Sequence, residues 1–462
     1  MKIAICASEV VPFAKTGGLA DVAGALPLAL EDLRQDVVVI MPKYKSIQEP
    51  KFKIRKVKEG ISYSTIGKDI KVYFIENEAY FNRDSLYGDK NGDYQDNLSR
   101  FSYFSRAALD LLKEINFKAD IIHVHDWQSC LIPVYLKTLY KDEPFYKKMR
   151  TVLTIHNIGY QGLFNREEFP KLGLDWSLFN MENLEFYDKV NILKGGMIFS
   201  DIINTVSEAY SREIQGEEFG YGLEGVLAKR KDDLFGILNG LDYFIWNPED
   251  DKFILENFSS ANPEGKHKDK ADLQAFCKLP LKKDIPLFGI VSRLAEQKGL
   301  DILSEAMDEI CNMDIQMVIL GTGDLKYHLI LEEMVKIYPK VISLHLKFDD
   351  TLAHKIYAGS DIFLMPSKYE PCGLGQMISL RYGTIPLVFK TGGLADTINE
   401  KNGFVFDKYA SRELVDTIKK SIKAFKDKKK WTGLISVAMK CNFSWSASAK
   451  KYIQLYEKAN KK

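Results

Sequence analysis

The strongest constraint on the fold of this chain is a regular alternation of short apolar runs with helical patterns. Residues 2–7 form an apolar run, residues 19–33 form a helical pattern that contains Pro27, and residues 37–41 form a second apolar run. Short apolar runs bounded by loops are typical of strands buried in a parallel sheet. A strand, a helix and a second strand in this order predict a right-handed crossover and an α/β fold.

The same alternation continues along all 462 residues and predicts two sheets. In the first half, strands are expected over residues 72–75, 121–124, 152–155, 202–206 and 234–238, with a helix over 97–115. In the second half, strands are expected over residues 287–291, 316–320, 341–344, 361–365, 385–389 and 404–406, before a last helix over 444–457. Two doubly wound domains of this size predict an active site in the cleft between them.

The boundary between the domains is expected in a polar stretch that is rich in Asp, Asn and Lys and contains Pro248 and Pro263. The predicted organisation is an N-terminal domain over residues 1–246, a linker over 247–272, a C-terminal domain over 273–440, and a C-terminal helix over 441–462 that returns to the N-terminal domain.

Composition excludes several classes of function. The net charge of +1 argues against electrostatic binding to nucleic acid or to a membrane surface. No apolar run is long enough to span a bilayer, and Glu9 interrupts the first apolar run too early for a signal peptide. The six cysteines are scattered without a CxxC pair, which disfavours a zinc ribbon and is typical of reduced thiols. We therefore expect a cytoplasmic protein with no nucleic-acid or membrane partner.

Residues 360–379 combine an apolar strand, a loop and a helix that is expected to open near Gly373. Loops of this kind lie at the carboxyl end of a parallel sheet, where ligands bind. Gly373 and Gly375 would bare backbone N–H groups for an anion, and Glu370 would accept hydrogen bonds from hydroxyl groups. The combination favours a sugar phosphate or a nucleotide sugar; the alternative is an ordinary turn with a solvated glutamate.

One heptapeptide, KTGGLAD, occurs at Lys15–Asp21 and again at Lys390–Asp396. Each copy follows an apolar strand, and a pair of glycines allows the backbone to approach a ligand closely. Both loops are therefore expected to face one ligand; the alternative is that each solves a local loop problem.

Two cations, Arg293 and Lys298, follow the strand predicted over residues 287–291. A guanidinium fork and a flexible ammonium group at a strand end suit a diphosphate, although a solvated face is the alternative.

Two further strands end in polar side chains. His123 and His125 would share one face of a strand, but no further ligand has the spacing of a metal site. Asp126 beside Trp127 predicts a sugar subsite instead, and His156, which precedes Asn157, follows the next strand. A packed and satisfied histidine is the alternative reading of His156.

Other ligand motifs are excluded. The segment from residue 89 resembles a calcium loop, but Tyr94 and Arg100 stand where an EF-hand needs Gly and Glu. The chain has no phosphate loop of the GxxxxGK[ST] type and no GxGxxG after its first strand.

Taken together, these motifs resemble those of the bacterial glycogen synthases and plant starch synthases. The matching segments run in order along the whole chain: KTGGLADV (15–22), YQDNLSRF (94–101), HVHDW (123–127), TIHN (154–157), NGLD (239–242), SRLAEQKG (292–299), EPCGLGQ (370–376), TGGLADT (391–397) and FSW (443–445).

The resemblance implies a GT-B fold, which consists of two Rossmann-like domains, and transfer of glucose from ADP-glucose to the non-reducing end of an α-1,4-glucan such as glycogen with retention of configuration. It implies no cofactor and no metal. The implied catalytic residues are Glu370, His156, Lys298, Arg293 and Asp126. The implied substrate-binding residues are Lys15, Gly18, Asp21, Tyr94, Asn157, Asn239, Phe348, Cys372, Gly373, Leu374, Gly375 and Thr391.

One departure concerns Gly375, which stands where relatives usually carry a side chain able to hydrogen-bond phosphate, often Thr. Two other functions stay open. A glycan phosphorylase shares the fold but needs a lysine bound to pyridoxal phosphate. A catalytically silent glucan-binding protein is disfavoured by the full set of phosphate cations and by Glu370.

Overall fold

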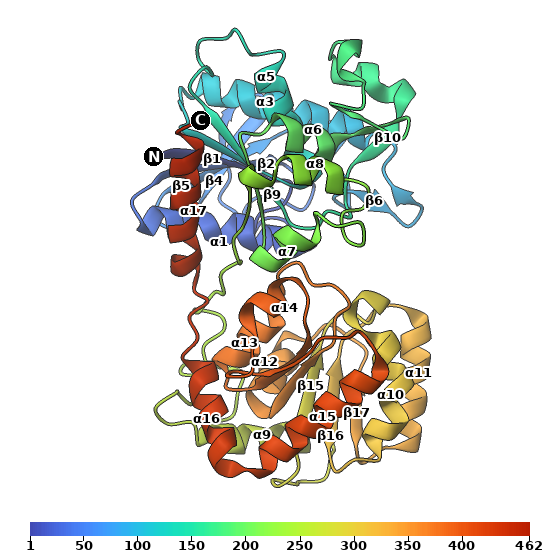
Figure 1. The fold of residues 1–462 in the computed structure, drawn as a ribbon. Coiled ribbons are helices and arrows are strands. Elements are labelled where there is room, and N and C mark those ends of the chain that lie inside the picture. Colours follow the sequence, from blue (N-terminus) through green and yellow to red (C-terminus); the bar gives the residue numbers. More distant parts are fainter. The chain divides into compact units, whose positions relative to one another are not determined.

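The computed structural model describes residues 1–462 and divides into two compact units. Unit 1 contains Met1–Gly240 and Trp445–Lys462, and unit 2 contains Leu241–Ser444 (Figure 1). The sequence placed the boundary after residue 246, whereas the structure places it between Gly240 and Leu241.

Unit 1 is built on a nine-stranded sheet in the order β14-β13-β9-β8-β1-β2-β5-β4-β3. The seven strands from β14 to β5 pair in parallel, as the apolar runs predicted. The strands are β1 (Lys2–Cys6), β2 (Asp36–Pro42), β3 (Arg55–Lys58), β4 (Ile61–Ile66), β5 (Ile70–Ile75), β8 (Ile121–His125), β9 (Arg150–Ile155), β13 (Ile202–Thr205) and β14 (Leu234–Gly236). The helices include α1 (Gly18–Asp32), α2 (Glu78–Phe81), α3 (Asn97–Glu114), α4 (Asp126–Ser129), α5 (Leu131–Lys137), α6 (Ile192–Phe199), α7 (Glu208–Glu213), α8 (Glu224–Lys229) and α17 (Trp445–Ala459).

The sequence did not predict β3 and β4, which extend the parallel sheet as an antiparallel hairpin. All four residues of β3 are exposed, and three of the four are charged. A charged edge strand resists pairing with other chains but lacks the apolar run by which buried strands were recognised.

A small three-stranded sheet also lies in unit 1, away from the main sheet (Figure 1). Its order is β10-β12-β11, and both pairings are antiparallel. Its strands are β10 (Leu163–Asn165), β11 (Glu185–Phe186) and β12 (Lys189–Asn191), with the 3₁₀ helices η1 (Arg166–Leu172) and η2 (Trp176–Leu178) between the first two.

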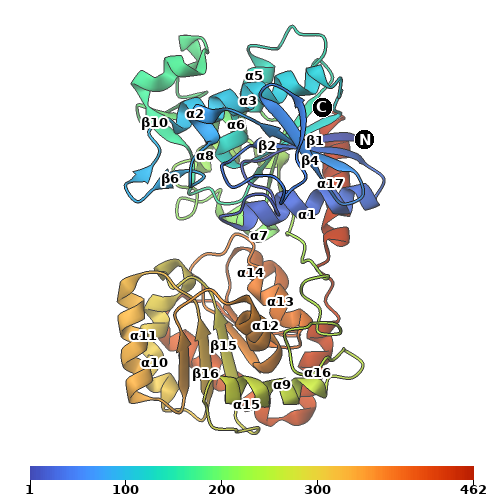
Figure 2. The ribbon, with the colours of Figure 1, turned by 180° about the vertical axis from the view of Figure 1, so that it is seen from behind.

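The C-terminal helix α17 returns to unit 1, where it lies beside α1 in both ribbon views (Figure 2). Tyr452 and Tyr456 are fully buried there. The hydroxyl group of Tyr456 lies 2.8 Å from Nδ1 of His123, a buried residue of β8. The end of the chain thus supplies a polar contact to the middle of the first sheet.

Unit 2 is built on a six-stranded, entirely parallel sheet in the order β17-β16-β15-β18-β19-β20. The strands are β15 (Leu287–Val291), β16 (Gln316–Leu320), β17 (Ile342–His345), β18 (Ile362–Met365), β19 (Ile385–Phe389) and β20 (Phe404–Phe406). The helices include α9 (Gly265–Phe276), α10 (Leu300–Cys311), α11 (Leu325–Ile337), α12 (Asp350–Gly359), α13 (Gly375–Arg381), α14 (Gly392–Thr397), α15 (Ser411–Lys426) and α16 (Lys428–Met439). Each predicted strand of this half lies within about one residue of an observed strand.

The polar stretch predicted as a linker belongs to unit 2. Asp251 is buried, and its Oδ2 lies 2.6 Å from Nδ1 of His354 and accepts a 2.5 Å hydrogen bond from the hydroxyl group of Tyr382. The indole ring of Trp246 stacks on His354 with 4.1 Å between the ring centroids. The composition of this stretch does not reveal these contacts, because a sequence does not distinguish a buried Asp from a solvated Asp.

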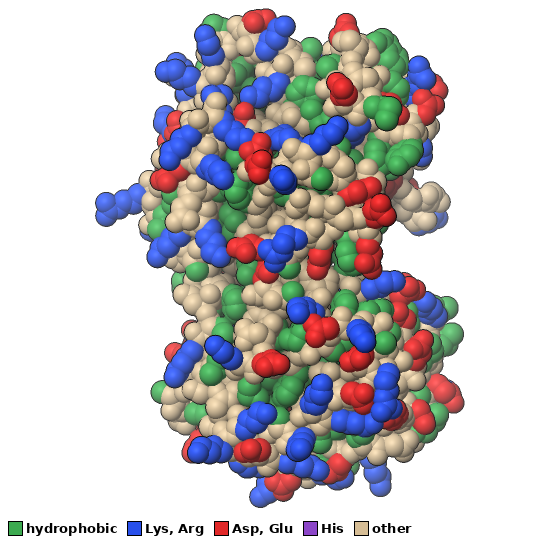
Figure 3. Space-filling model, in the orientation of Figure 1, with side chains coloured by type: hydrophobic (Ala, Val, Ile, Leu, Met, Phe, Trp, Pro, Cys, Tyr) green, Lys and Arg blue, Asp and Glu red, His purple; other side chains and the backbone are tan.

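Neither unit contains a helix that is both long enough and apolar enough to cross a membrane. On the face drawn in Figure 3, basic and acidic side chains are interspersed over both units, in keeping with the net charge of +1.

We expect Asp251→Ala to lower the free energy of unfolding of unit 2 by about 3 kcal/mol, because the change leaves buried polar partners without an acceptor. Urea unfolding followed by tryptophan fluorescence, to which Trp246 contributes, measures the loss. Asp416→Ala removes an exposed ion pair with Arg412 and should change the unfolding free energy by less than about 0.5 kcal/mol.

The same contact predicts a dependence on pH. Burial alone would raise the pKa of Asp251, but hydrogen bonds from His354 and Tyr382 outweigh it and lower the pKa. The stabilisation is therefore complete above the unfolded-state pKa of about 3.9 and is lost as the pH falls through the lower folded-state value. Equal destabilisation by Asp251→Ala at all pH values would contradict this account.

Candidate functional site

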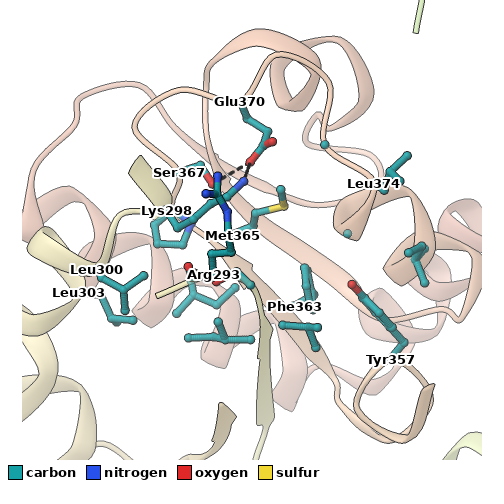
Figure 4. A pocket seen from close by; sticks show the side chains of 18 residues that line it. Arg293, Lys298, Leu300, Leu303, Tyr357, Phe363, Met365, Ser367, Glu370 and Leu374 are labelled. Carbon is teal, nitrogen blue, oxygen red and sulfur yellow. Dashed lines mark hydrogen bonds and ion pairs between the residues drawn. The ribbon is translucent and has the colours of Figure 1, made fainter. Parts of the chain in front are cut away.

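A cavity of about 280 Å³ opens at the carboxyl ends of β15 and β18 in unit 2 (Figure 4). It gathers six of the residues predicted from the sequence: Arg293, Lys298, Glu370, Gly373, Leu374 and Gly375. Apolar side chains, including those of Leu303 and Phe363, form much of the remaining wall. Two cations and one carboxylate thus meet in a largely apolar pocket, which is the usual composition of a small-molecule site.

The polar centre of this cavity is an ion pair between Lys298 and Glu370. Their Nζ and Oε2 atoms are 2.5 Å apart, and the two side chains are only 16% and 9% exposed. The hydroxyl group of Ser367 donates to the same Oε2 at 3.2 Å (Figure 4). Sequence reasoning placed a phosphate cation and a hydroxyl acceptor in this region without foreseeing that they pair directly.

The loop that carries Glu370 depends on a glycine in the left-handed region. Gly373 has φ +73°, and a Cβ atom there would lie 2.5 Å from Oε1 of Gln376. The side-chain amide of Gln376 donates to the carbonyl groups of Cys372 and Gly373 at 3.0 and 3.2 Å. Helix α13 begins at Gly375, two residues later than the predicted start near Gly373, because the turn at Gly373 precedes it.

Gly375 is closely packed. A Cβ atom at this position would lie 2.9 Å from the ring of Phe363 and 3.3 Å from the hydroxyl group of Tyr357. These two rings pack on each other with centroids 4.9 Å apart. A side chain at Gly375 therefore requires the aromatic pair to shift. The sequence gives no sign of this packing, because Tyr357 and Phe363 are not neighbours of Gly375 in the chain.

The two KTGGLAD copies have different structural roles. Cβ atoms added to Gly392 and Gly393 would lie 2.0 Å from the carbonyl oxygens of Glu370 and Cys372, respectively. The N–H of Gly393 also donates to the main-chain carbonyl group of Glu370 at 3.0 Å. The second copy, with Thr391 at the start of α14, therefore supports the loop of Glu370 from behind. In the first copy, Cβ atoms on Gly17 or Gly18 would meet no atom within 4 Å.

The loop of the first copy is bonded by Glu9. From the sequence, this residue was identified only as an interruption of an apolar run. Oε1 of Glu9 accepts hydrogen bonds of 2.6 Å from the hydroxyl groups of Thr16 and Tyr87, and Oε2 accepts from the N–H of Gly17 at 3.3 Å. Glu9 is only 4% exposed. It fixes the loop, whereas Lys15 stays half-exposed and pairs with Asp21 at 2.7 Å.

The predicted HVHDW and TIHN segments meet because β8 and β9 are neighbours in the sheet. Oδ1 of Asp126 accepts a 2.7 Å hydrogen bond from the N–H of His156. Burial raises the pKa of Asp126 to about 7, a direction that nearby Glu9 reinforces and that N–H groups of His156 and Asn157 oppose. Asp126 also has φ +52°, an uncommon conformation for a residue with a side chain.

His125 contacts His156 directly, with 2.9 Å between Nδ1 of His125 and Nε2 of His156. Burial lowers the pKa of His156 to about 3, so both rings are neutral at physiological pH. Nε2 of His125 is buried without a hydrogen-bond partner. A buried N–H without an acceptor is the rarer defect, so we assign the proton of His125 to Nδ1. His125 then donates to Nε2 of His156, whose own proton is left on Nδ1.

A second pocket, of about 420 Å³, lies in unit 1. Its wall includes Tyr94, Trp127, Gln161, Asn165 and Glu168, which combine aromatic faces with amide and carboxylate groups. Of the two residues from which the sequence predicted a sugar subsite, Trp127 lines this pocket and Asp126 does not. Strand β10 and helix η1 contribute Asn165 and Glu168 to the wall.

The remaining predicted residues fall outside these two pockets. Phe348 is 84% exposed, beside the start of α12, and Cys372 is buried. Oδ1 of Asn157 accepts from the N–H of Gly159 at 3.0 Å, and Oδ1 of Asn239 is buried without a partner. No group of three or more His, Cys, Asp or Glu side chains gathers to hold a metal ion.

Comparison with known proteins agrees with the resemblance seen in the motifs. Residues 2–229 match the family model of the starch synthase catalytic domain, and residues 274–432 match that of glycosyl transferases group 1. The chain is 49% identical to the glycogen synthase of Geotalea daltonii over 99% of this chain and 98% of that protein. It is also 49% identical to the glycogen synthase of Thermosipho melanesiensis, over the full length of both.

Solved structures give the same result. The catalytic domain of starch synthase IV from Arabidopsis thaliana, solved with ADP and acarbose, is similar with a TM-score of 0.89 and 34% identity, covering 100% of this chain and 99% of that one. Sucrose-phosphate synthase from Thermosynechococcus elongatus shares the fold, with a TM-score of 0.62 and 17% identity. The chain therefore belongs to the glycogen and starch synthase family of glycosyltransferases with the GT-B fold.

Proposed function

We propose that this enzyme transfers glucose from ADP-glucose to the non-reducing end of an α-1,4-glucan, with retention of configuration, in glycogen synthesis. The observation that carries the proposal is the pairing of Lys298 with Glu370 beside Arg293 in the cavity of unit 2. A nucleotide sugar has a diphosphate, which binds cations, and a sugar, whose hydroxyl groups donate to a carboxylate. This cavity holds both a pair of cations and a carboxylate.

On this proposal, the cavity of unit 2 binds the donor. Departure of ADP leaves negative charge on the diphosphate, and preorganised cations in an apolar pocket stabilise such charge strongly. Arg293 suits two phosphate oxygens at once, and Lys298 acts as a point charge. Glu370 accepts hydrogen bonds from the hydroxyl groups of the transferred glucose, while its present partner Lys298 holds the carboxylate in place.

The acceptor is assigned to unit 1. The pocket lined by Tyr94 and Trp127 offers aromatic faces for the apolar faces of sugar rings, and the amide of Gln161 offers a donor for hydroxyl groups. His156 and Asp126 are the groups of this unit that are assigned to the reacting sugars. The assignment of Nδ1 as the protonated atom gives His156 a hydrogen-bond donor that no group of the protein uses.

The experiment that tests the function is an assay of glucose transfer to glycogen from radiolabelled ADP-glucose, with UDP-glucose as a competitor. Transfer from ADP-glucose in the absence of inorganic phosphate supports the proposal. Activity that requires phosphate, together with the absorbance of pyridoxal phosphate in the purified protein, would instead identify a phosphorylase. Binding of glycogen without transfer would identify a silent glucan-binding protein.

The ion pair predicts opposite effects on binding and on turnover. In Glu370→Gln, Lys298 loses its partner and becomes fully available to the diphosphate, so ADP binding should tighten by about 3-fold to 10-fold. Turnover should fall by roughly 10²–10³, because a contact with the reacting sugar is lost. Isothermal titration calorimetry with ADP and initial-rate kinetics measure the two effects separately.

The matched variants are Lys298→Ala, which should weaken ADP binding by about 10-fold or more, and Lys419→Ala, which removes an exposed lysine paired with Glu309 and should leave both quantities unchanged. Weaker ADP binding in Glu370→Gln would show that the carboxylate supports the nucleotide rather than competing for Lys298.

We also propose that the reaction needs no metal ion, because Arg293 and Lys298 already supply positive charge to the leaving group. Initial rates should be unchanged in excess EDTA. A loss of activity that added magnesium or manganese restores would overturn this prediction.

The contact between His125 and His156 predicts a positioning effect. His125→Leu removes the donor and should lower kcat by about 10-fold to 100-fold with little change in the KM for donor. His125→Asn places an amide N–H near the position of Nδ1 and should retain more activity than the leucine variant. Selective ¹⁵N labelling of histidine in the free enzyme tests the tautomer directly: a proton found on Nε2 of His156 would contradict the assignment.

A further inference from the structure

Beyond the pocket of unit 1, several aromatic side chains lie exposed on the surface. Tyr160, Tyr187 and Tyr221 are 62%, 80% and 46% exposed, and Phe186 is partly buried beside them. We refer to these four residues as the aromatic ridge. In the orientation of Figure 3, hydrophobic side chains gather over the part of unit 1 that contains β10.

The ridge is continuous with the pocket. Tyr160 belongs to both, and the side-chain amide of Gln161, which lines the pocket, donates to the carbonyl group of Tyr221 at 3.0 Å. A Cβ atom on Gly222, the residue after Tyr221, would lie 2.7 Å from the ring of Phe186 and 3.6 Å from that of Tyr187. The rings of Phe186 and Tyr187 pack edge to face at 4.7 Å. A path of aromatic groups therefore leads out of the pocket across the surface.

Two of these tyrosines occupy a costly backbone conformation. Tyr187 has φ +50° and Tyr221 has φ +51°, in the left-handed region that bulky residues rarely adopt. Glycine or asparagine would occupy both positions with less strain. Neither exposed ring offsets that strain by filling a core. Strain of this kind persists where a side chain serves a function, so the rings themselves require an explanation.

The substrate class supplies that explanation. A glucan is a polymer, and a pocket of about 420 Å³ encloses only its end, so the rest of the chain must leave across the adjoining surface. Sugar rings present apolar faces that pack on exposed tyrosines, whose hydroxyl groups stay in water. We propose that Tyr160, Tyr187 and Tyr221 form a track that binds glucose units of the acceptor distal to the pocket. The proposal rests on the assignment of this pocket to an α-1,4-glucan.

The track predicts that its effect depends on the length of the acceptor. In the double variant Tyr187→Asn/Tyr221→Asn, KM for glycogen and for maltoheptaose should rise by about 3-fold to 10-fold. KM for maltotriose and for ADP-glucose should stay unchanged, as should kcat. Asparagine tolerates the left-handed region, so the melting temperature should be unchanged or higher. Phe276→Ala, which removes a half-exposed ring from α9 of unit 2, is the matched control.

Binding without turnover separates this inference from the proposed function. In native gels that contain glycogen but no donor, the wild-type protein should be retarded and the double variant much less so. If the wild-type protein binds glycogen but transfers no glucose, the proposed function fails while the track stands. Equal retardation of the two proteins, a rise in KM that is the same for short and long acceptors, or a large fall in melting temperature would each overturn the track.

Discussion

Parallel pairing of the strands is the constraint on which both sites of this protein depend. In a parallel sheet every strand ends at the same edge, so residues distant in sequence are brought together there without any long-range recognition of their own. In unit 1, the pairing of β8 with β9 places Asp126 against the backbone of His156. In unit 2, the pairing of β15 with β18 brings the loop of Lys298 to that of Glu370.

At these edges, and on the surface beside the pocket of unit 1, the protein keeps arrangements that a purely structural segment would avoid. A buried ion pair such as Lys298–Glu370 gains little stability, because both charges are removed from water. Nε2 of His125 is buried without a partner, and Asp126, Tyr187 and Tyr221 have positive φ. Costs of this kind are expected where geometry serves binding or chemistry. These features coincide with residues of the candidate sites, although positive φ also occurs at other turns, such as those of Arg34 and Lys53.

The repeated heptapeptide shows that two identical sequences can have different packing roles in one protein. Both copies begin a helix after a strand, which local sequence does determine. Gly392 and Gly393 nevertheless pack against the backbone of Glu370 and Cys372, whereas Gly17 and Gly18 have open space above them. The difference comes from the neighbouring segments: the loop of Glu370 packs on the second copy, whereas the first copy is bonded by Glu9 and no segment packs on its glycines.

The sequence by itself determined the α/β class, the parallel strands, and the residues whose chemistry suits a diphosphate and a sugar, because apolar periodicity and residue type are local properties. It missed β3, whose residues are charged, and it read the segment around Asp251 as a linker. Only the tertiary structure decided partners: that Lys298 pairs with Glu370, that His125 contacts His156, that Gln376 bonds the loop at Gly373, and that Tyr221 adjoins the pocket of Trp127. Such pairings depend on which segments the sheets bring together, and side chains far apart in sequence carry no local sign of one another.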